Sequence, residues 1–153
     1  MCVVAAHAGG ADNSLLERLA LCQDSWLDWK EHDPARLKNY ANAIKAGFTG
    51  SGHEAWVTPR SSQSVAGLRV IQVYPESVGM GVGFSVLVEA SFARVKKIVE
   101  QRLGRSFGKC EPPSDNMRTC DMPIADKKTV GVMSEDSDKA TRTLISCYYF
   151  YAK

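Results

Sequence analysis

The chain has 153 residues, of which 44% are hydrophobic and 24% are charged. This length and composition indicate one globular domain of common size and exclude a disordered chain. The formal net charge is +2, from 19 basic and 17 acidic residues, and no block of Lys or Arg occurs. This balance argues against a protein that binds nucleic acid without sequence preference. No apolar run is long enough for a helix that spans a bilayer.

The N-terminus resembles the end of an export signal. Residues 1–8 are mostly apolar and end in Ala6-His7-Ala8, an Ala-x-Ala sequence of the kind that signal peptidase cleaves. A charged segment and most of an apolar segment are missing. We therefore treat residues 1–11 as an export-signal remnant or a disordered start, and residues 12–153 as a single α+β domain.

The cysteines also favour export. Apart from Cys2, the chain has an even number of cysteines, which fits two disulfides in an oxidising compartment. Cys110 and Cys120 flank a polar, turn-rich loop, so we expect them to pair and to leave Cys22 for Cys147. A zinc site is the alternative, but neither C-x2-C spacing nor a nearby pair of histidines is present, and no metal is expected.

Two helices are expected in the first third of the chain. Ser14 and Glu17 have the spacing of a capping box, which predicts a helix that begins at Ser14. The helix carries an apolar stripe at alternating four- and three-residue spacings: Leu15, Leu19, Cys22, Trp26 and Trp29. Asp33-Pro34 is typical of the start of a second helix. The short connection around His32 predicts an antiparallel helical hairpin.

Strands are expected next. Residues 55–58 predict a short strand that ends at Pro59, residues 60–66 a loop, and residues 68–74 a strand that ends at Pro75. The segment 75–81 reads as a turn. Alternating residues at 82–88 predict a strand whose core face carries Val82, Phe84, Val86 and Val88.

The last third predicts one helix and two strands. Ser91 caps a helix that ends at Gly104, and the strands cover 128–133 and 142–151. The predicted fold is α+β: an N-terminal helical hairpin, then a β-β-α-β-β antiparallel sheet with helices packed on one face. The aromatic segment Tyr148–Tyr151 puts rings on both faces of the last strand. We expect a second subunit to cover the other face, because it would otherwise be a large exposed apolar patch.

The junction between the helical and the β parts is the candidate site. It consists of Thr49, Gly50, Ser51, Gly52 and His53, with a small hydroxyl between two glycines. Such a segment can be a flexible connection. It can also be a finger that enters a partner's groove, because glycines allow close approach of the backbone.

No enzyme motif is found. The glycines are adjacent to Ser51, whereas a nucleophile elbow needs them two positions away and follows a strand. Gly79–Gly83 precedes a strand and does not match a phosphate-binding loop. A hydrolase that uses Ser51 or His53 is a weak alternative. We expect no enzyme activity, no catalytic residue and no cofactor.

The chain resembles the periplasmic immunity proteins that protect bacteria from type VI secretion peptidoglycan amidases, specifically the small homodimeric group. The segments that carry the resemblance are Gly50–His53, Pro75–Phe84 and Cys147–Tyr151. The resemblance covers most of residues 14–153.

The resemblance implies an amidase inhibitor without enzymatic activity. It would bind the effector, an NlpC/P60-like cysteine peptidase, and occlude its catalytic cleft. Ser51 would be at the tip, Gly50, Gly52 and His53 would shape the loop, and the protein would be a homodimer in the periplasm. Neither nucleic acid nor membrane is an expected partner. The alternative is a periplasmic ligand- or envelope-binding module whose site lies between the tryptophan-bearing helix and the sheet.

Overall fold

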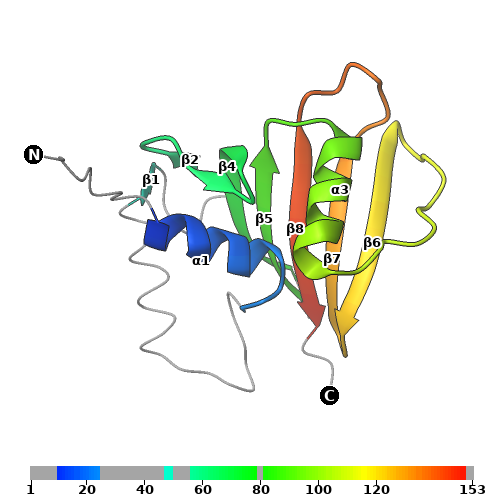
Figure 1. Ribbon diagram of the computed structural model, residues 1–153, viewed down its shortest axis with the longest axis horizontal. Helices are drawn as coiled ribbons and strands as arrows, with labels where there is room; N and C mark the ends of the chain where they lie inside the picture. Colours follow the sequence, from blue (N-terminus) through cyan, green and yellow to red (C-terminus); the bar gives the residue numbers. More distant parts are fainter. Residues whose placement is uncertain (1–9, 25–46, 50–55, 79–80, 151–153) are drawn as a thin grey trace, which may run out of the picture.

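The computed structural model describes residues 10–24, 47–49, 56–78 and 81–150. Two helices, α1 (Gly10–Ala20) and α3 (Phe92–Leu103), lie on the same face of a large antiparallel sheet (Figure 1). The sheet has the strand order β3-β4-β5-β8-β7-β6, and β1 and β2 form a separate two-stranded ribbon. The bounds are β1 Phe48–Thr49, β2 Thr58–Pro59, β3 Ser64–Val65, β4 Leu68–Val78, β5 Gly81–Val88, β6 Met117–Ala125, β7 Lys128–Glu135 and β8 Thr143–Phe150.

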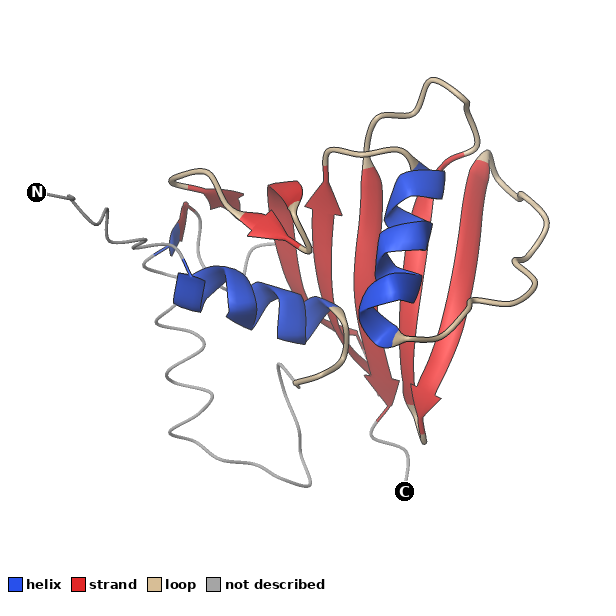
Figure 2. Cartoon of the chain, in the orientation of Figure 1, coloured by secondary structure: helices blue, strands red, loops and turns tan. Residues whose placement is uncertain are grey.

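The α+β class and the placement of helices on one face are confirmed (Figure 2). The core lies between the two helices and the sheet. Phe84, Val86 and Val88 of β5 are completely buried, as their alternation predicts. Across the sheet, Ile145 of β8 and Val132 of β7 continue the same buried face. The domain therefore has one contiguous core.

The first helix differs from its prediction at both ends. It begins at Gly10, so Ser14 lies inside it and the capping box is wrong. The helix thus includes Gly10 and Ala11, which belong to the segment 1–11 that we expected to precede the domain. Glu17 instead accepts a hydrogen bond from the backbone N–H of Ala66 at 2.9 Å. The carboxylate thus stabilises a tight turn between strands and does not close its own helix end.

The helix also ends earlier than expected. It stops at Ala20, and Cys22 follows with φ of 55°. A left-handed residue of this kind cannot continue an α-helix, so the chain turns and brings Cys22 to the sheet. The remaining part of the predicted stripe, Trp26 and Trp29, and most of the second helix of the hairpin lie outside the described residues.

The second described helix agrees with its prediction. It starts after Ser91 and ends at Gly104, whose φ of 63° is the left-handed conformation typical of a helix C-terminus. Ser91 takes the N-cap position, although its side chain makes no capping hydrogen bond. The carboxylate of Glu100 accepts from the backbone N–H of Phe107 at 3.0 Å and from Lys96 at 2.9 Å. These contacts fix the chain as it leaves α3.

Proline does not end the strand at residue 75, contrary to the prediction. Pro75 is inside β4 and lies opposite Phe84 of β5. β4 pairs with β3 only through Leu68 and Arg69, so β3 does not extend alongside Pro75. A proline is tolerated there because its missing N–H would not point at β5.

The predicted β-β-α-β-β order is also incomplete. An additional strand, β6, begins in the predicted loop between Cys110 and Cys120 and continues through residues for which no element was predicted, and β3 was missed as well. β6 contains Pro123 and lies at an edge of the sheet, where proline is permitted. β3 reaches β4 through a two-residue turn in which Ala66 and Gly67 both have positive φ. That geometry is a type I′ turn, but Ala-Gly is not its usual sequence.

Candidate functional site

The predicted loop begins in a described strand and continues outside the described residues. Thr49 is the last residue of β1, and its side chain is exposed. Gly50, Ser51, Gly52 and His53 lie outside the described residues. The structure describes the residues on either side of this segment, which form its base.

That base is a narrow ribbon. Thr49 pairs with Thr58 and Phe48 pairs with Pro59, so the two ends of the segment are neighbours. The Thr49 hydroxyl donates to the Thr58 carbonyl at 3.3 Å. Arg60 donates from Nε to the Phe48 carbonyl at 2.9 Å. The chain between residues 49 and 58 is therefore closed at its base.

The ribbon is anchored to the core on both sides. Phe48 and Val57 are buried, and Val57 exchanges backbone hydrogen bonds of 2.9 Å with Val73 of β4. Beneath the ribbon, Gln63 donates to the Gly47 carbonyl at 3.3 Å, and its other amide atom, Oε1, has no hydrogen-bond partner in the described part of the chain. The base of the loop thus rests on the main sheet and not on another loop.

Both predicted cysteine pairs form disulfides. Cys22 bonds to Cys147 with Cα atoms 5.1 Å apart, and Cys110 bonds to Cys120 with Cα atoms 4.5 Å apart. The first disulfide joins the turn after α1 to β8. The second pins the loop before β6 to that edge strand. None of these four cysteines is a free thiol, and the described residues contain no group of three or more His, Cys, Asp and Glu side chains that could hold a metal ion.

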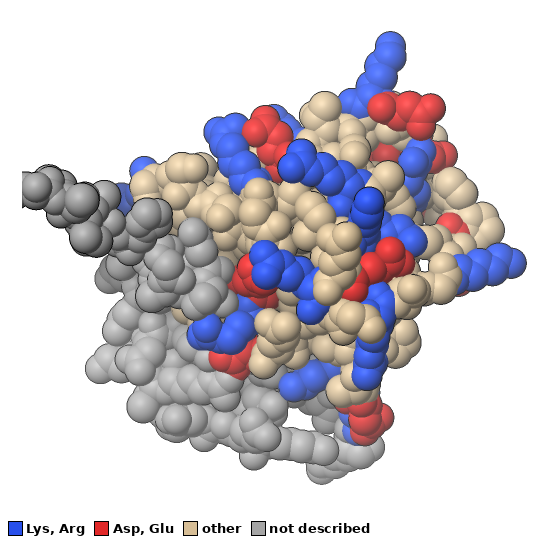
Figure 3. Space-filling view, in the orientation of Figure 1, with Lys and Arg blue, Asp and Glu red and all other residues tan. Residues whose placement is uncertain are grey.

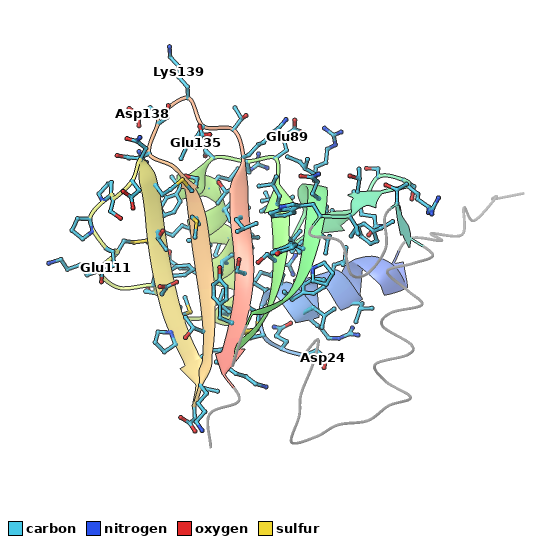
Figure 4. All side chains as sticks on the ribbon, turned by 180° about the vertical axis from the view of Figure 1, so that it is seen from behind. Asp24, Glu89, Glu111, Glu135, Asp138 and Lys139 are labelled. Atoms are coloured by element: carbon cyan, nitrogen blue, oxygen red, sulfur yellow. A yellow bond between two sulfur atoms is a disulfide. The ribbon has the colours of Figure 1, made fainter. Side chains whose placement is uncertain are left out.

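The sheet face opposite the helices, which faces the viewer in Figure 4, is called the rear face here. Its residues follow from strand alternation and register. Tyr148 of β8 lies between two glycines: a Cβ atom on Gly83 would be 3.3 Å from the ring, and one on Gly131 would be 3.2 Å from it. The glycines leave room for the ring on both neighbouring strands. Beside it, the hydroxyls of Ser85 and Ser146 are 2.7 Å apart and buried.

Trp56 belongs to the same face, although it precedes β2. Its ring stacks on Tyr74 of β4, with centroids 4.9 Å apart and an interplanar angle of 23°. The side chain is 39% exposed, which is high for a large apolar group. Trp56 is the first described residue after the predicted loop, so the loop base and the rear face meet here.

A cavity of about 400 Å³ opens beside Trp56. Residues of four strands and of the β7–β8 connection line it: Trp56, Leu87, Met117, Met133, Ser134, Glu135, Lys139, Ala140, Thr141, Arg142 and Leu144. An apolar hollow of this size with a few polar groups at its mouth is typical of a ligand site. Sequence reasoning missed it because its residues are scattered over the chain. Only the register of the sheet brings Leu87, Met133 and Leu144 into one row.

Among the described residues, two carboxyl groups have clearly shifted pKa values. Burial raises the pKa of Asp121 above its ordinary value, and the nearby Glu111 carboxylate raises it further. The backbone N–H of Phe107 and the Lys96 ammonium lower the pKa of Glu100. Asp121 lies on the rear face next to Gly131, whereas Glu100 is part of the exit from α3. Neither carboxyl group lines the cavity.

The helix side carries charges of both signs in small groups (Figure 3). Ion pairs include Arg69 with Glu89 at 2.7 Å and Arg102 with Glu17 at 3.5 Å. This side of the molecule therefore has mixed charge. No helix within the described residues is long and apolar enough to cross a membrane.

No family model matches the chain, and comparisons with curated proteins and with solved structures give no significant match.

Proposed function

We propose that the chain is an immunity protein that binds a secreted peptidoglycan amidase of the NlpC/P60-like cysteine peptidase class. The loop Thr49–His53 would enter the catalytic cleft of the amidase and exclude its substrate. The observation that carries this proposal is the closed base of the loop. Thr49 pairs with Thr58, and Val57 is bonded to Val73 of the main sheet.

A closed base suits an inhibitor for an energetic reason. Association costs conformational freedom in both partners, and a segment whose ends are already fixed loses less of it on binding. Small residues at the tip, Gly50, Ser51 and Gly52, fit a cleft that is shaped for an extended substrate. In this proposal Ser51 offers a hydroxyl to the catalytic thiolate or imidazole without being a cleavable bond.

The two disulfides support export. Disulfides persist in oxidising compartments, and the amidase would act on the cell wall in the periplasm. We therefore propose a periplasmic location. A disulfide that joins the turn after α1 to β8 also makes the domain beneath the loop more rigid.

The homodimer is proposed on the rear face, at the end around Tyr148. The Tyr148 ring is only half-buried although it lies in the central strands of the sheet. A second copy would remove this apolar surface from water. Sedimentation equilibrium tests the dimer, and a chain that stays monomeric at micromolar concentrations contradicts it.

This proposal expects a cell-wall hydrolase to be encoded beside the gene for this chain, and inhibition is tested with that hydrolase. The wild-type chain should bind it and block its amidase activity. Ser51→Trp should weaken inhibition by roughly a hundred-fold or more, because the bulky ring cannot enter the cleft. Ser61→Trp is the matched control, since Ser61 is an exposed serine that lies outside the loop. Equal inhibition by Ser51→Trp and wild type would rule out the plugging mechanism.

A second candidate function is a ligand- or envelope-binding module, and the cavity beside Trp56 favours it. The sequence predicted the site of such a module between the tryptophan-bearing helix and the sheet. Its tryptophans, Trp26 and Trp29, lie outside the described residues. A chain that does not bind the neighbouring hydrolase but retains a small ligand from periplasmic extract would support this module. Amidase or esterase activity of the pure chain, lost in Ser51→Ala, would instead indicate an enzyme.

A further inference from the structure

The cavity beside Trp56 has an apolar floor and one aromatic wall. Leu87, Leu144 and Met133 come from three adjacent strands and form one row across the rear face. Trp56 stands at one end of this row and is held by its stack on Tyr74. A branched or aromatic group of a ligand could bury most of its surface here.

The mouth of the cavity carries two opposite charges, Glu135 at the end of β7 and Arg142 directly before β8. Met133 pairs with Leu144, and this antiparallel register, continued by two residues beyond the last pair, puts Glu135 opposite Arg142. Both side chains are exposed. No ion pair joins them, and neither has another ion-pair partner within residues 10–24, 47–49, 56–78 and 81–150. The site thus offers one anion and one cation to a ligand.

Other charges nearby do not neutralise these two. Asp136 and Asp138 both interact with Arg118, at 2.7 Å and 3.7 Å. Lys139 lines the cavity but its side chain extends away from the sheet, whereas Glu135 lies at the end of β7 (Figure 4). The charge pattern at the mouth is therefore set by Glu135 and Arg142.

The loop that forms the rim is fixed before any ligand binds. Arg118 anchors Asp136 from β6, and the backbone N–H of Asp136 donates to Asn116 at 2.7 Å. At the other end, the buried hydroxyl of Thr143 donates to the Ala90 carbonyl at 2.8 Å. A preformed rim lowers the entropic cost of binding a small molecule.

We propose that this cavity binds a small zwitterionic amphipath: a free α-amino acid with a large apolar side chain, or a dipeptide of such residues. The apolar side chain lies on the leucine and methionine floor against Trp56. The ammonium group pairs with Glu135 and the carboxylate with Arg142. A fatty acid would leave Glu135 unpaired beside its tail, and a neutral sugar would use neither charge. This inference does not depend on the inhibitor proposal.

Isothermal titration calorimetry with L-phenylalanine tests the proposal. Two analogues of the same shape each lack one charge: 3-phenylpropanoate has no ammonium group, and phenethylamine has no carboxylate. L-phenylalanine should bind about ten-fold or more tightly than either analogue, because each ion pair to an exposed charge adds to affinity. L-leucine and the dipeptide Leu-Phe should bind in the same site and compete with it.

Two variants separate the roles of the charges. Arg142→Met should weaken L-phenylalanine about ten-fold and leave phenethylamine unchanged, whereas Glu135→Gln should weaken L-phenylalanine similarly and leave 3-phenylpropanoate unchanged. Arg94→Met and Glu111→Gln are the controls, since both residues are exposed and do not line the cavity. Each variant is also assayed for inhibition of the neighbouring hydrolase, so that loss of the ligand and loss of the inhibitor function are read separately.

Several results would overturn the proposal. One is that L-phenylalanine binds no better than its two analogues. Another is that Arg142→Met and Glu135→Gln both bind it as the wild type does. A third is absence of binding by all these probes to a chain that circular dichroism shows to be folded. Leu87→Trp, which fills the floor, should abolish binding; retained affinity in this variant would place the ligand elsewhere.

Discussion

Trp56 stacks on Tyr74 with ring centroids 4.9 Å apart, and this contact joins the exit of the Thr49–His53 loop to the main sheet. Tyr74 lies in β4, one residue beyond Val73, which is bonded to Val57. Two successive residues after the loop are therefore fixed to two successive residues of one strand. The loop base, the rear face and the cavity share this point of attachment.

Replacement of Trp56 by alanine tests that attachment. Trp56→Ala should lower the free energy of unfolding by about 1–2 kcal/mol, through the lost stack and the lost apolar contact. It should also weaken both ligand binding and inhibition. Trp56→Phe is the control and should retain most of the stability, because a phenyl ring can still stack on Tyr74. Urea unfolding followed by circular dichroism measures the change. Equal stability of Trp56→Ala and wild type would show that the stack does not hold the loop base.

The two disulfides should differ in their contribution to stability. Cys22–Cys147 spans a sequence separation of 125 residues, and Cys110–Cys120 spans 10. In the chain-entropy model, removal of the long-range bridge costs roughly 4–5 kcal/mol and removal of the short one about 3 kcal/mol. The paired variants Cys22→Ala/Cys147→Ala and Cys110→Ala/Cys120→Ala should show this order in urea unfolding. The reverse order would mean that the edge strand β6 depends more on its disulfide than loop entropy accounts for.

Sequence reasoning worked where one local signal was strong. Phe84, Val86 and Val88 alternate strictly, and the strand they predict is β5. Gly104 ends α3 because glycine takes the left-handed conformation without strain. Cys110 and Cys120 were paired from the loop between them, and the second pair followed by elimination.

Prediction from the sequence failed where the position of a residue in the fold overrides its local preference. Pro75 predicted the end of a strand, yet β4 continues through it, because β3 does not reach alongside this residue. The stripe through Cys22 predicted a longer helix, whereas the disulfide to β8 needs the chain to turn at that residue. The cavity could not be predicted, because its lining depends on the strand order β5-β8-β7 and on Trp56, which follows the loop.

Gly131 should be intolerant of a side chain because of space and not because of its backbone conformation. A Cβ atom there would be 2.8 Å from Asp121 Oδ1 and 3.2 Å from the Tyr148 ring. Asp121 can rotate away, but the ring must shift from its place between Gly83 and Gly131. Gly131→Ala should therefore cost about 1–2 kcal/mol of stability. In a chain that already carries Tyr148→Ala, the substitution Gly131→Ala should cost less stability than it does in the wild type. Additive effects in this cycle would contradict the proposed clash.

Asp121 should make the protein less stable as the pH rises. Burial disfavours its carboxylate, and Glu111 adds repulsion, so its pKa in the folded state lies above the ordinary value of 3.8. The folded state therefore holds this proton to a higher pH than the unfolded chain does. Stability is lost as the pH rises from the ordinary aspartate range through the raised folded pKa, and the loss is complete above that folded pKa.

Asp121→Asn removes this titration and should stabilise the protein at pH 7. The gain should be below about 1 kcal/mol, because the side chain is partly exposed and solvent screens its charge. At pH 3, where Asp121 is largely protonated in both states, the variant and the wild type should differ much less. Glu111→Gln should give a smaller gain in the same direction, since repulsion is the lesser cause. Urea unfolding at several pH values measures both differences. A stabilisation by Asp121→Asn that is the same at pH 3 and pH 7 would assign the effect to packing and not to charge.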